Sequence, residues 1–337
     1  MSEVNSSMEI FKDLFHLEDR WGKDGVFTPT NIVKDMIDLL PDSIWNPEST
    51  FIDISCKTGA FLVEIYTRLD TELSKLDEYK DPVKRRSHIL NNQLFGLALC
   101  NDESLFFSRR NVFGDPFSDN IDVINAGNSS YLDLVKQKQY SIIETQLKGK
   151  FGRMKFDVVV GNPPYNNDIY LKFVEIGHQI AESYTLMITP AKWQAKGGKK
   201  NEQFRKKIVP YMRITVYYPD SRDIFNIDCQ GGVCYYLIDS ERPSTRKLTT
   251  LCKNQKLFET DYTEDITGES LYIMYNYRVR GIVHKLGNFK QLKCLNKARE
   301  GKYNVAITNV YSEKSCTSKS GMAYVTISPY IIQTVYK

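Results

Sequence analysis

The residues whose chemistry is easiest to read follow a short β-branched run, Asp157 to Val160, near the middle of the chain. This run reads as a buried strand, and it ends in Gly161-Asn162-Pro163-Pro164-Tyr165. Two consecutive prolines cannot continue a strand, so the chain must turn there. The turn holds a side-chain amide, a main-chain carbonyl and an aromatic ring together at the carboxyl end of a strand, where open α/β sheets bind ligands.

Two hydrogen-bond acceptors beside an aromatic face suit an aromatic amine such as that of adenine, whose lone pair is delocalised into the ring. The Asn162 side-chain oxygen and the Pro163 carbonyl can accept both amine hydrogens and so raise the electron density on the nitrogen. Tyr165 can stack on the base, which must leave the double helix to be reached. The motif therefore predicts methyl transfer to the adenine amine. The structural alternative is a rigid proline turn in which Asn162 caps the local backbone.

A second candidate site lies at the first strand-to-helix turn of the chain. Residues 50–54 read as a buried strand and residues 60–69 as an amphipathic helix, with Gly59 in the turn between them. Asp53 can hold the amino group of a cofactor, Gly59 permits close backbone approach, and the free N–H groups of the helix suit a carboxylate. A glycine in an ordinary turn without a ligand fits the same pattern.

Two later positions bear on a nucleoside cofactor. An acid that binds ribose is expected after Gly96, at the end of the second predicted strand, but Ala98 stands there, and Asp102 or Glu103 are the substitutes. Asp115 follows Gly114 and precedes a proline. It can contact the cofactor's adenine or simply occupy a type I turn.

These positions require a scaffold in which strands alternate with helices, and the chain supplies that alternation up to about residue 240. We predict an α/β fold with a doubly wound, mainly parallel sheet. The predicted strands are 50–54, 93–99, 156–160, 185–188, 213–218 and 233–238. The predicted helices are 9–17, 29–40 with Thr28 as its N-cap and Pro29 at its first position, 60–69 and 170–182. Residues 117–152 read as a polar connection with a helix near 131–135.

The pattern divides the chain into a helical N-terminal leader (1–24), a catalytic domain (25–240) and a linker with a partial target-recognition region (241–337). Only about ninety residues follow the linker near 242–246, which is small for a recognition domain. The final predicted strand, 330–336, runs into the end of the sequence. We therefore expect a truncated product or a subunit whose own DNA binding is weak, salt-sensitive and nearly sequence-blind.

Composition narrows the class of protein. The chain has 337 residues, 42% of them hydrophobic, and a net charge of +4, which is compatible with nucleic-acid binding but does not require it. Its 7 cysteines are scattered without a CxxC pair, which favours reduced thiols over a zinc site. The sequence has neither a signal peptide nor a run long enough to span a membrane, so we expect a cytoplasmic protein. We find no metal site of the kind that nucleases use and predict no metal.

A basic stretch follows the predicted strand at 185–188. It contains Lys192, Lys196, Lys199 and Lys200 around a Gly-Gly pair, and then 205–207 (Arg-Lys-Lys). Such a segment near the catalytic turn can hold DNA phosphates. A solvated loop and helix face explains the same residues and is the slightly favoured interpretation.

The order of these motifs resembles the γ-class adenine-N6 DNA methyltransferases of restriction–modification systems, and most of all the methylase part of enzymes that join modification and restriction in one chain. The similar stretch covers roughly residues 20 to 240. Its motifs are Phe27-Thr28-Pro29, 53–61, Gly96, Gly114-Asp115 and 162–165, followed by the stretches 183–200 and 225–239.

The resemblance implies S-adenosylmethionine as cofactor, double-stranded DNA as substrate, and a separate restriction or specificity subunit as partner. The catalytic residues it implies are Asn162, Pro163, Pro164 and Tyr165. The cofactor-binding residues it implies are Phe27, Thr28, Pro29, Asp53, Gly59, Phe61 and Asp115. Departures from the family pattern are Ile54, where the family has proline, Lys57, where it has a glycine, and Ala98, where it has an acid. These departures concern cofactor affinity more than the fold.

Two other functions fit parts of the pattern. A non-catalytic DNA-binding or specificity subunit would keep the fold and tolerate Lys57 and Ala98. RNA or protein methyltransferases use similar tetrapeptides on amine or amide nitrogens. The intact tetrapeptide at 162–165 favours an enzyme, and the N-terminal Phe-Thr-Pro favours DNA as its substrate.

Overall fold

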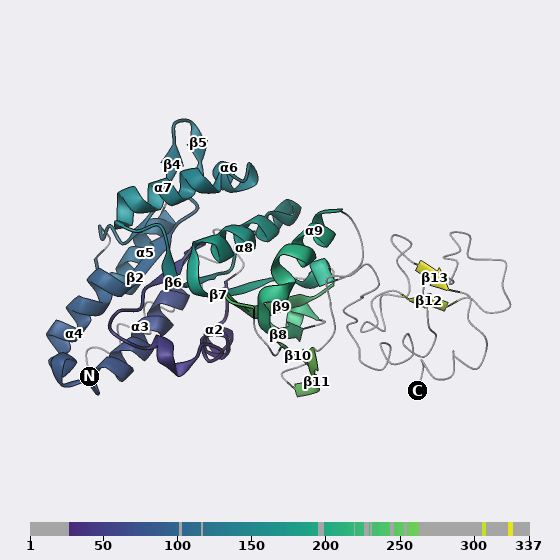
Figure 1. Cartoon of the computed structure of the whole chain (residues 1–337), viewed down its shortest axis with the longest axis horizontal. Coiled ribbons are helices and arrows are strands. Elements are labelled where there is room, and N and C mark those ends of the chain that lie inside the picture. The colour runs from purple at the N-terminus through teal and green to yellow at the C-terminus, as the bar shows by residue number, and fades with distance from the viewer. Residues whose placement is uncertain are drawn as a thin grey trace.

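The computed structural model describes residues 27–100, 103–115, 117–194, 199–218, 220–225, 229, 231–242, 246–252, 255–262, 305–307 and 323–325. Its centre is a nine-stranded sheet with the strand order β11-β10-β8-β9-β7-β6-β1-β2-β3 (Figure 1). The strands are β1 (Phe51–Asp53), β2 (Leu94–Leu97), β3 (Ile121–Asp122), β6 (Phe156–Gly161), β7 (Ala181–Pro190), β8 (Met212–Tyr218), β9 (Val233–Asp239), β10 (Arg246–Cys252) and β11 (Gln255–Tyr262). Two small pairs, β4 (Asn125–Ala126) with β5 (Ser129–Ser130) and β12 (Val305–Ile307) with β13 (Ala323–Val325), stand apart from it.

The strands that carry the predicted motifs run parallel at the centre of this sheet. β1 pairs with β6 so that Asp53 lies opposite Val160, and β6 pairs with β7 so that Gly161 lies opposite Met187. At the other end of the first pair, the Asp157 carboxylate accepts hydrogen bonds from the N–H and the hydroxyl of Thr50, each at 2.8 Å. The side-chain clamp and the backbone ladder together set the register that brings the ends of β1 and β6 to one edge.

The remaining pairings make the sheet mixed. β9 is antiparallel to both β7 and β8, whereas β10 is parallel to β8 and antiparallel to β11. The mainly parallel α/β fold predicted from the sequence is confirmed. The domain boundary predicted near residue 240 stays a prediction, although β10 and β11 continue the sheet to Tyr262.

Helices cover both faces of the sheet and enclose two hydrophobic cores. Successive residues of a strand point to opposite faces, so Ile52 and Val159 belong to one core and Phe51 and Val160 to the other. The first core packs under α6 (Tyr131–Lys136), α7 (Tyr140–Phe151), α8 (Ile169–Ile180) and α9 (Lys199–Ile208). The second packs under α2 (Thr30–Ile37), α3 (Ala60–Leu73) and α5 (Glu103–Phe113), near α4 (Pro82–His88) (Figure 1).

Most predicted elements of the catalytic region are present within a few residues of their expected bounds. The exceptions have physical causes. The helix expected near 131–135 is present as α6, which begins with a capping box between Ser130 and Asp133, but the polar connection expected at 117–152 also contains a second helix, α7, that was not predicted. Thr28 was expected to cap α2, but the N-cap is Pro29. The Thr28 hydroxyl instead accepts a hydrogen bond from Asn162, the residue that follows β6. The leader at 1–24, its helix at 9–17 and the strand at 330–336 lie outside the described residues.

Gly59 is the N-cap of α3, and its backbone is in the left-handed region with φ of +76°. A Cβ atom at this position would lie 2.4 Å from Cγ2 of Val112 on α5. The sequence predicts a glycine here for approach to a ligand. In the structure, the close approach is to α5, so the glycine is required for packing as well as for backbone conformation.

We expect Gly59→Ala to lower the free energy of unfolding more than Gly152→Ala. Gly152 ends α7 with φ of +72°, but a Cβ atom there meets nothing within 4 Å. Both substitutions strain the backbone similarly, so their difference isolates the clash with Val112, which is expected to cost about 1–3 kcal/mol. Urea unfolding of the two variants measures it. An equal loss of stability in both would contradict the packing role of Gly59.

Candidate active site

The predicted catalytic motif leaves the sheet at the carboxyl end of β6 and enters α8 through a short 3-10 turn at Asn166–Asp168. Asn162 is 5% exposed, Pro163 is buried, and Pro164 and Tyr165 are half-buried. The strand end and the start of α8 therefore support the tetrapeptide from both sides, as expected for a rigid turn that aims polar groups.

A hydrogen bond ties Asn162 to the N-terminal end of the described chain. The Asn162 amide nitrogen donates to the Thr28 hydroxyl oxygen at 3.1 Å, across a separation of 134 residues. Since nitrogen and oxygen occupy opposite ends of a planar amide, this contact turns the Asn162 side-chain oxygen away from Thr28. The Phe-Thr-Pro element thus orients the residue that the sequence predicts as the acceptor for the target amine.

A small cleft brings one predicted catalytic residue, Asn162, together with predicted cofactor residues. Its lining includes most of the residues predicted for the cofactor, together with Asn162. The full set that lines it is Phe27, Thr28, Asp53, Ser55, Lys57, Thr58, Gly59, Ala60, Phe61 and Asn162. The loop after β1, the start of α3, the segment before α2 and the end of β6 therefore share one cleft, although they span most of the first half of the chain.

Asp53 is the buried charge of this cleft. Its side chain is 3% exposed, and burial raises its pKa from 3.8 to about 7. A hydrogen bond from the Ser55 N–H at 2.9 Å and the nearby Lys57 ammonium favour the ionised form, but they offset burial only in part. A carboxylate held in this way gains from a cationic partner, which the amino group of a cofactor would provide.

Ser55 is a site residue that sequence reasoning missed. Its hydroxyl oxygen is buried without a hydrogen-bond partner among the described residues. A Cβ atom on Gly161 would lie 2.7 Å from this oxygen and 3.6 Å from Asp53 Oδ1. The glycine before the catalytic motif therefore permits contact between the two loops. The available signal was position, because Ser55 stands two residues beyond Asp53 in the same turn.

Tyr165 stands against two other aromatic rings. Its ring packs edge-on against Tyr170 at 6.4 Å and against Phe225 at 6.3 Å between centroids. Burial raises the pKa of its hydroxyl well above the ordinary value, so the group stays protonated. Phe225 begins the later stretch that resembles the family, and its contact with Tyr165 places the start of that stretch beside the predicted catalytic turn.

Five predicted site residues are not among those that line the cleft, namely Pro163, Pro164 and Tyr165 of the predicted catalytic motif and Asp115 and Pro29 of the predicted cofactor set. Asp115 is exposed, and its carboxylate accepts a hydrogen bond from the Phe117 N–H at 2.9 Å, as in an ordinary Asx turn. Pro29 caps α2, where its carbonyl accepts the Val33 N–H at 3.0 Å. Ala98 is buried just beyond β2, while Asp102 and the side chain of Glu103 lie outside the described residues.

Within the described part of the chain, His, Cys, Asp and Glu side chains form no group of three or more that could hold a metal ion. The helices among those residues are also too short or too polar to cross a membrane.

A family model and a related protein both match this chain over most of its length. The model of the N-6 DNA methylase family matches residues 16–210. An uncharacterized adenine-specific methylase from Mycoplasma pneumoniae is 29% identical, over 67% of this chain and 69% of that protein.

Similar solved structures agree on the fold. A modification subunit assigned to a type I restriction enzyme of Vibrio vulnificus has a TM-score of 0.52 at 14% identity, covering 74% of this chain and 52% of its own. The M protein of the type I restriction enzyme EcoKI has a TM-score of 0.50 at 16% identity, covering 69% and 49%. A DrdV–DNA complex has a TM-score of 0.52 at 12% identity, covering 77% and 32%. This chain thus spans about half the length of the first two proteins.

We expect Asp53→Asn to stabilise the protein at pH 8 and to do so much less at pH 5. Between the unfolded pKa near 3.8 and the folded pKa of about 7, the folded state keeps a proton that the unfolded state has lost, so wild-type stability falls as pH rises through this window. Above pH 7 the penalty is constant, on the order of 4 kcal/mol. Asparagine has the same shape and carries no such penalty.

Urea unfolding of both proteins at the two pH values tests this, with the exposed Asp119→Asn as a control for loss of any carboxylate. If the gain from Asp53→Asn were the same at pH 5 and pH 8, Asp53 would not be a desolvated acid.

Proposed function

The chain belongs to the N-6 DNA methylase family, the adenine-N6 DNA methyltransferases of restriction–modification systems, and on that premise we propose how its own residues perform the reaction. In this proposal, the cleft at the ends of β1 and β6 transfers a methyl group from S-adenosylmethionine to the N6 amine of an adenine in DNA. The observation that carries it is that Asn162 and Asp53 line one cleft, with the Asn162 amide oriented by Thr28.

The residues of the cleft fit the amino-acid end of S-adenosylmethionine. The buried Asp53 carboxylate would hold the cofactor's ammonium, and the Ser55 hydroxyl, which is buried without a partner among the described residues, would meet a second polar group. The start of α3 presents backbone N–H groups to a carboxylate. Phe27 and Phe61 add apolar walls. When bound, the cofactor supplies a methyl group activated by attachment to a sulfonium.

Lys57 replaces the first glycine of the family's cofactor loop and brings a cation into this cleft. Its ammonium lowers the pKa of Asp53, opposing the effect of burial, and so favours the ionised carboxylate that an ammonium ligand needs. The lysine also repels that ammonium. We propose that these effects offset one another and that the departure adjusts cofactor affinity without disabling the site.

Asn162 and Pro163 act on the substrate amine. The Asn162 side-chain oxygen and the Pro163 carbonyl accept its two hydrogens, which draws the nitrogen toward tetrahedral geometry and makes its lone pair available. Burial of Asn162 excludes water that would compete for these hydrogen bonds. Because no strong base is needed before transfer, the extra proton can leave to water afterwards.

The adenine amine lies inside the duplex, so the target base must be flipped out of the stack. Tyr165 offers an aromatic face at the edge of the catalytic turn, and its contacts with Tyr170 and Phe225 hold the ring in place. We propose that the extruded adenine stacks there. The hydroxyl of Tyr165 is buried and stays protonated, so the ring performs this role.

The proposed partners are double-stranded DNA and a separate restriction or specificity subunit, in the cytoplasm. Among the similar structures, DrdV is bound to DNA and the Vibrio protein is a modification subunit. A non-catalytic specificity subunit is the weaker alternative, because it would not need Asn162 held beside a buried Asp53.

We expect Asn162→Ala to lower the rate of methyl transfer by about a hundredfold or more, because one of the two acceptors for the target amine is lost. Binding of S-adenosylmethionine, measured by calorimetry, is expected to stay within a few-fold of wild type, because Asp53 and the start of α3 remain. Asn91→Ala, which changes an exposed asparagine before β2, is the matched control and should leave both unchanged.

Transfer within a few-fold of wild type by the Asn162 variant would contradict its catalytic role. Loss of cofactor binding together with activity, at an unchanged unfolding midpoint, would instead assign Asn162 to the cofactor.

A further inference from the structure

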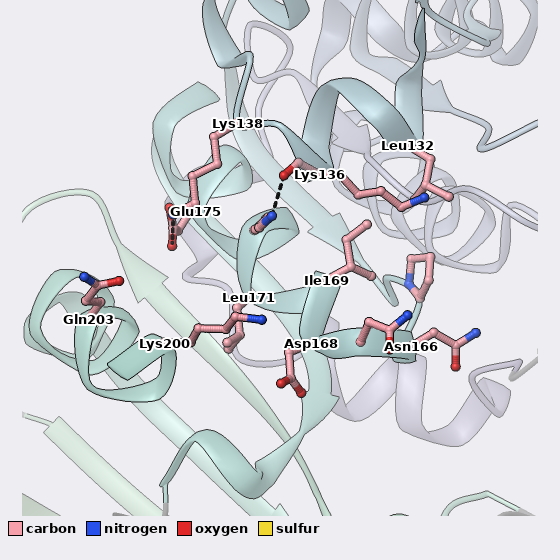
Figure 2. Close-up of a pocket in the computed structure, with 13 residues that line it drawn as sticks. Leu132, Lys136, Lys138, Asn166, Asp168, Ile169, Leu171, Glu175, Lys200 and Gln203 are labelled. Carbon is pink, nitrogen blue, oxygen red and sulfur yellow. Dashed lines mark hydrogen bonds and ion pairs between the residues drawn. The ribbon is translucent and has the colours of Figure 1, made fainter. Parts of the chain in front are cut away.

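A groove runs beside the catalytic turn on the face of the sheet covered by α6, α8 and α9. Its volume is about 610 Å³, and its lining begins at Pro164 of the catalytic motif and continues through Asn166 and Asn167 to α8 and α9. Figure 2 shows side chains from these elements facing one another across it. The groove is separate from the cleft that holds Asp53, but it starts at the residue next to Tyr165.

The groove carries positive charge from several elements. Lys136 and Lys138 come from the end of α6 and the residues after it, Lys172 from α8 and Lys200 from α9. In Figure 2, Lys200 extends from α9 toward α8, and Lys138 faces Glu175. Since these lysines are scattered through the sequence, only the fold makes them neighbours.

The two carboxylates in the lining already contact lysines. Glu175 lies 2.9 Å from the Lys138 ammonium and 3.3 Å from that of Lys207. Asp168 pairs with Lys192. Of the groove lysines, Lys138 is thus compensated by Glu175 and Lys136 by Asp133 at 3.7 Å, which leaves Lys172 and Lys200 without a carboxylate within ion-pair distance among the described residues.

The positive charges of Lys172 and Lys200 repel each other. The Lys172 ammonium donates to the carbonyl of Lys136, a contact that holds the amine near the other lysines. Burial lowers the pKa of Lys172, and so do the charges of Lys138 and Lys200. An anion between these side chains would relieve this repulsion, and the Asn166, Asn167 and Gln203 amides beside them offer further donors.

In the basic stretch predicted at 192–207, some residues make contacts within the protein and one lines the groove. Lys192 and Lys207 form ion pairs with Asp168 and Glu175, Lys206 pairs with Glu202 at 2.7 Å, and Arg205 is buried and donates to the Trp193 carbonyl at 2.8 Å. These four residues therefore make contacts within the protein. Lys200 is the member of the stretch that lines the groove, and Lys196 lies outside the described residues.

We propose that this groove binds a backbone phosphate of the DNA strand that carries the target adenine, with Lys172 and Lys200 as its principal contacts. The inference rests on the proposed function, because the groove begins at the turn where the flipped base would stand. A strand whose base enters that turn brings its adjacent phosphates to the rim at Pro164 and Asn166. Phosphate contacts of this kind position a strand without reading its sequence.

The test compares Lys172→Gln/Lys200→Gln with Lys75→Gln/Lys148→Gln, which removes the same charge from exposed lysines outside the groove. Binding of a labelled adenine-containing duplex is measured by anisotropy at several salt concentrations. We expect the groove variant to bind about tenfold more weakly at low salt, with the slope of log K against log salt reduced by about 1 to 2. Its affinity for S-adenosylmethionine and its unfolding midpoint should match those of the control.

Equal DNA affinity and equal salt slope in the two variants would overturn the proposal. It would also be overturned if the groove variant lost binding of inorganic phosphate, or of single-stranded RNA, while keeping that of duplex DNA. Failure of the proposed function is distinguishable, because the wild-type chain would then transfer no methyl group to DNA whatever the groove binds.

Discussion

The parallel pairing of β1 with β6 is the interaction on which the site depends. Asp53 lies opposite Val160 in that pair, so the loops that follow the two strands leave the sheet at the same edge. Gly161 lets them touch, since a Cβ atom there would meet the Ser55 hydroxyl at 2.7 Å. The clamp between Thr50 and Asp157 holds the register from the other end. A register shift of one residue would turn each side chain of β6 to the opposite face of the sheet and separate the two loops.

The buried polar groups of the cleft lower the stability of the folded protein when no ligand is bound. A carboxyl group whose pKa is raised to about 7 by burial, and a buried serine hydroxyl without a partner among the described residues, are both unfavourable in the protein alone. Two cores that cover both faces of the sheet offset that cost. A ligand with complementary charge would stabilise these polar groups when it binds. Asp53 and Ser55, which lower the stability of the protein alone, are therefore the residues that indicate the chemistry of the ligand.

Sequence reasoning located the parts of this site that depend on local chemistry. The apolar run before Gly161, the prolines after it and the turn at Gly59 each define their structure within a few residues. The parts it missed depend on distant contacts. Thr28 has the residue type of a helix cap, but a hydrogen bond to Asn162, 134 residues away, engages its side chain. The lysines of the groove become neighbours only when α6, α8 and α9 pack on one face. The helix expected near 131–135 is present as α6. The signal for α7 was also in the sequence, because Tyr140, Ile143 and Leu147 recur at helical spacing, but the polar residues between them obscured it.

We propose that the cleft between β1 and β6 methylates the N6 amine of adenine in DNA. The most direct measurement incubates the chain with S-adenosylmethionine labelled in its methyl group and with duplex DNA at low salt, and then digests the DNA to nucleosides. The account predicts that the label appears in N6-methyladenine. Label recovered in methylcytosine, in RNA or in protein, or an absence of transfer although calorimetry shows the cofactor bound, would contradict it.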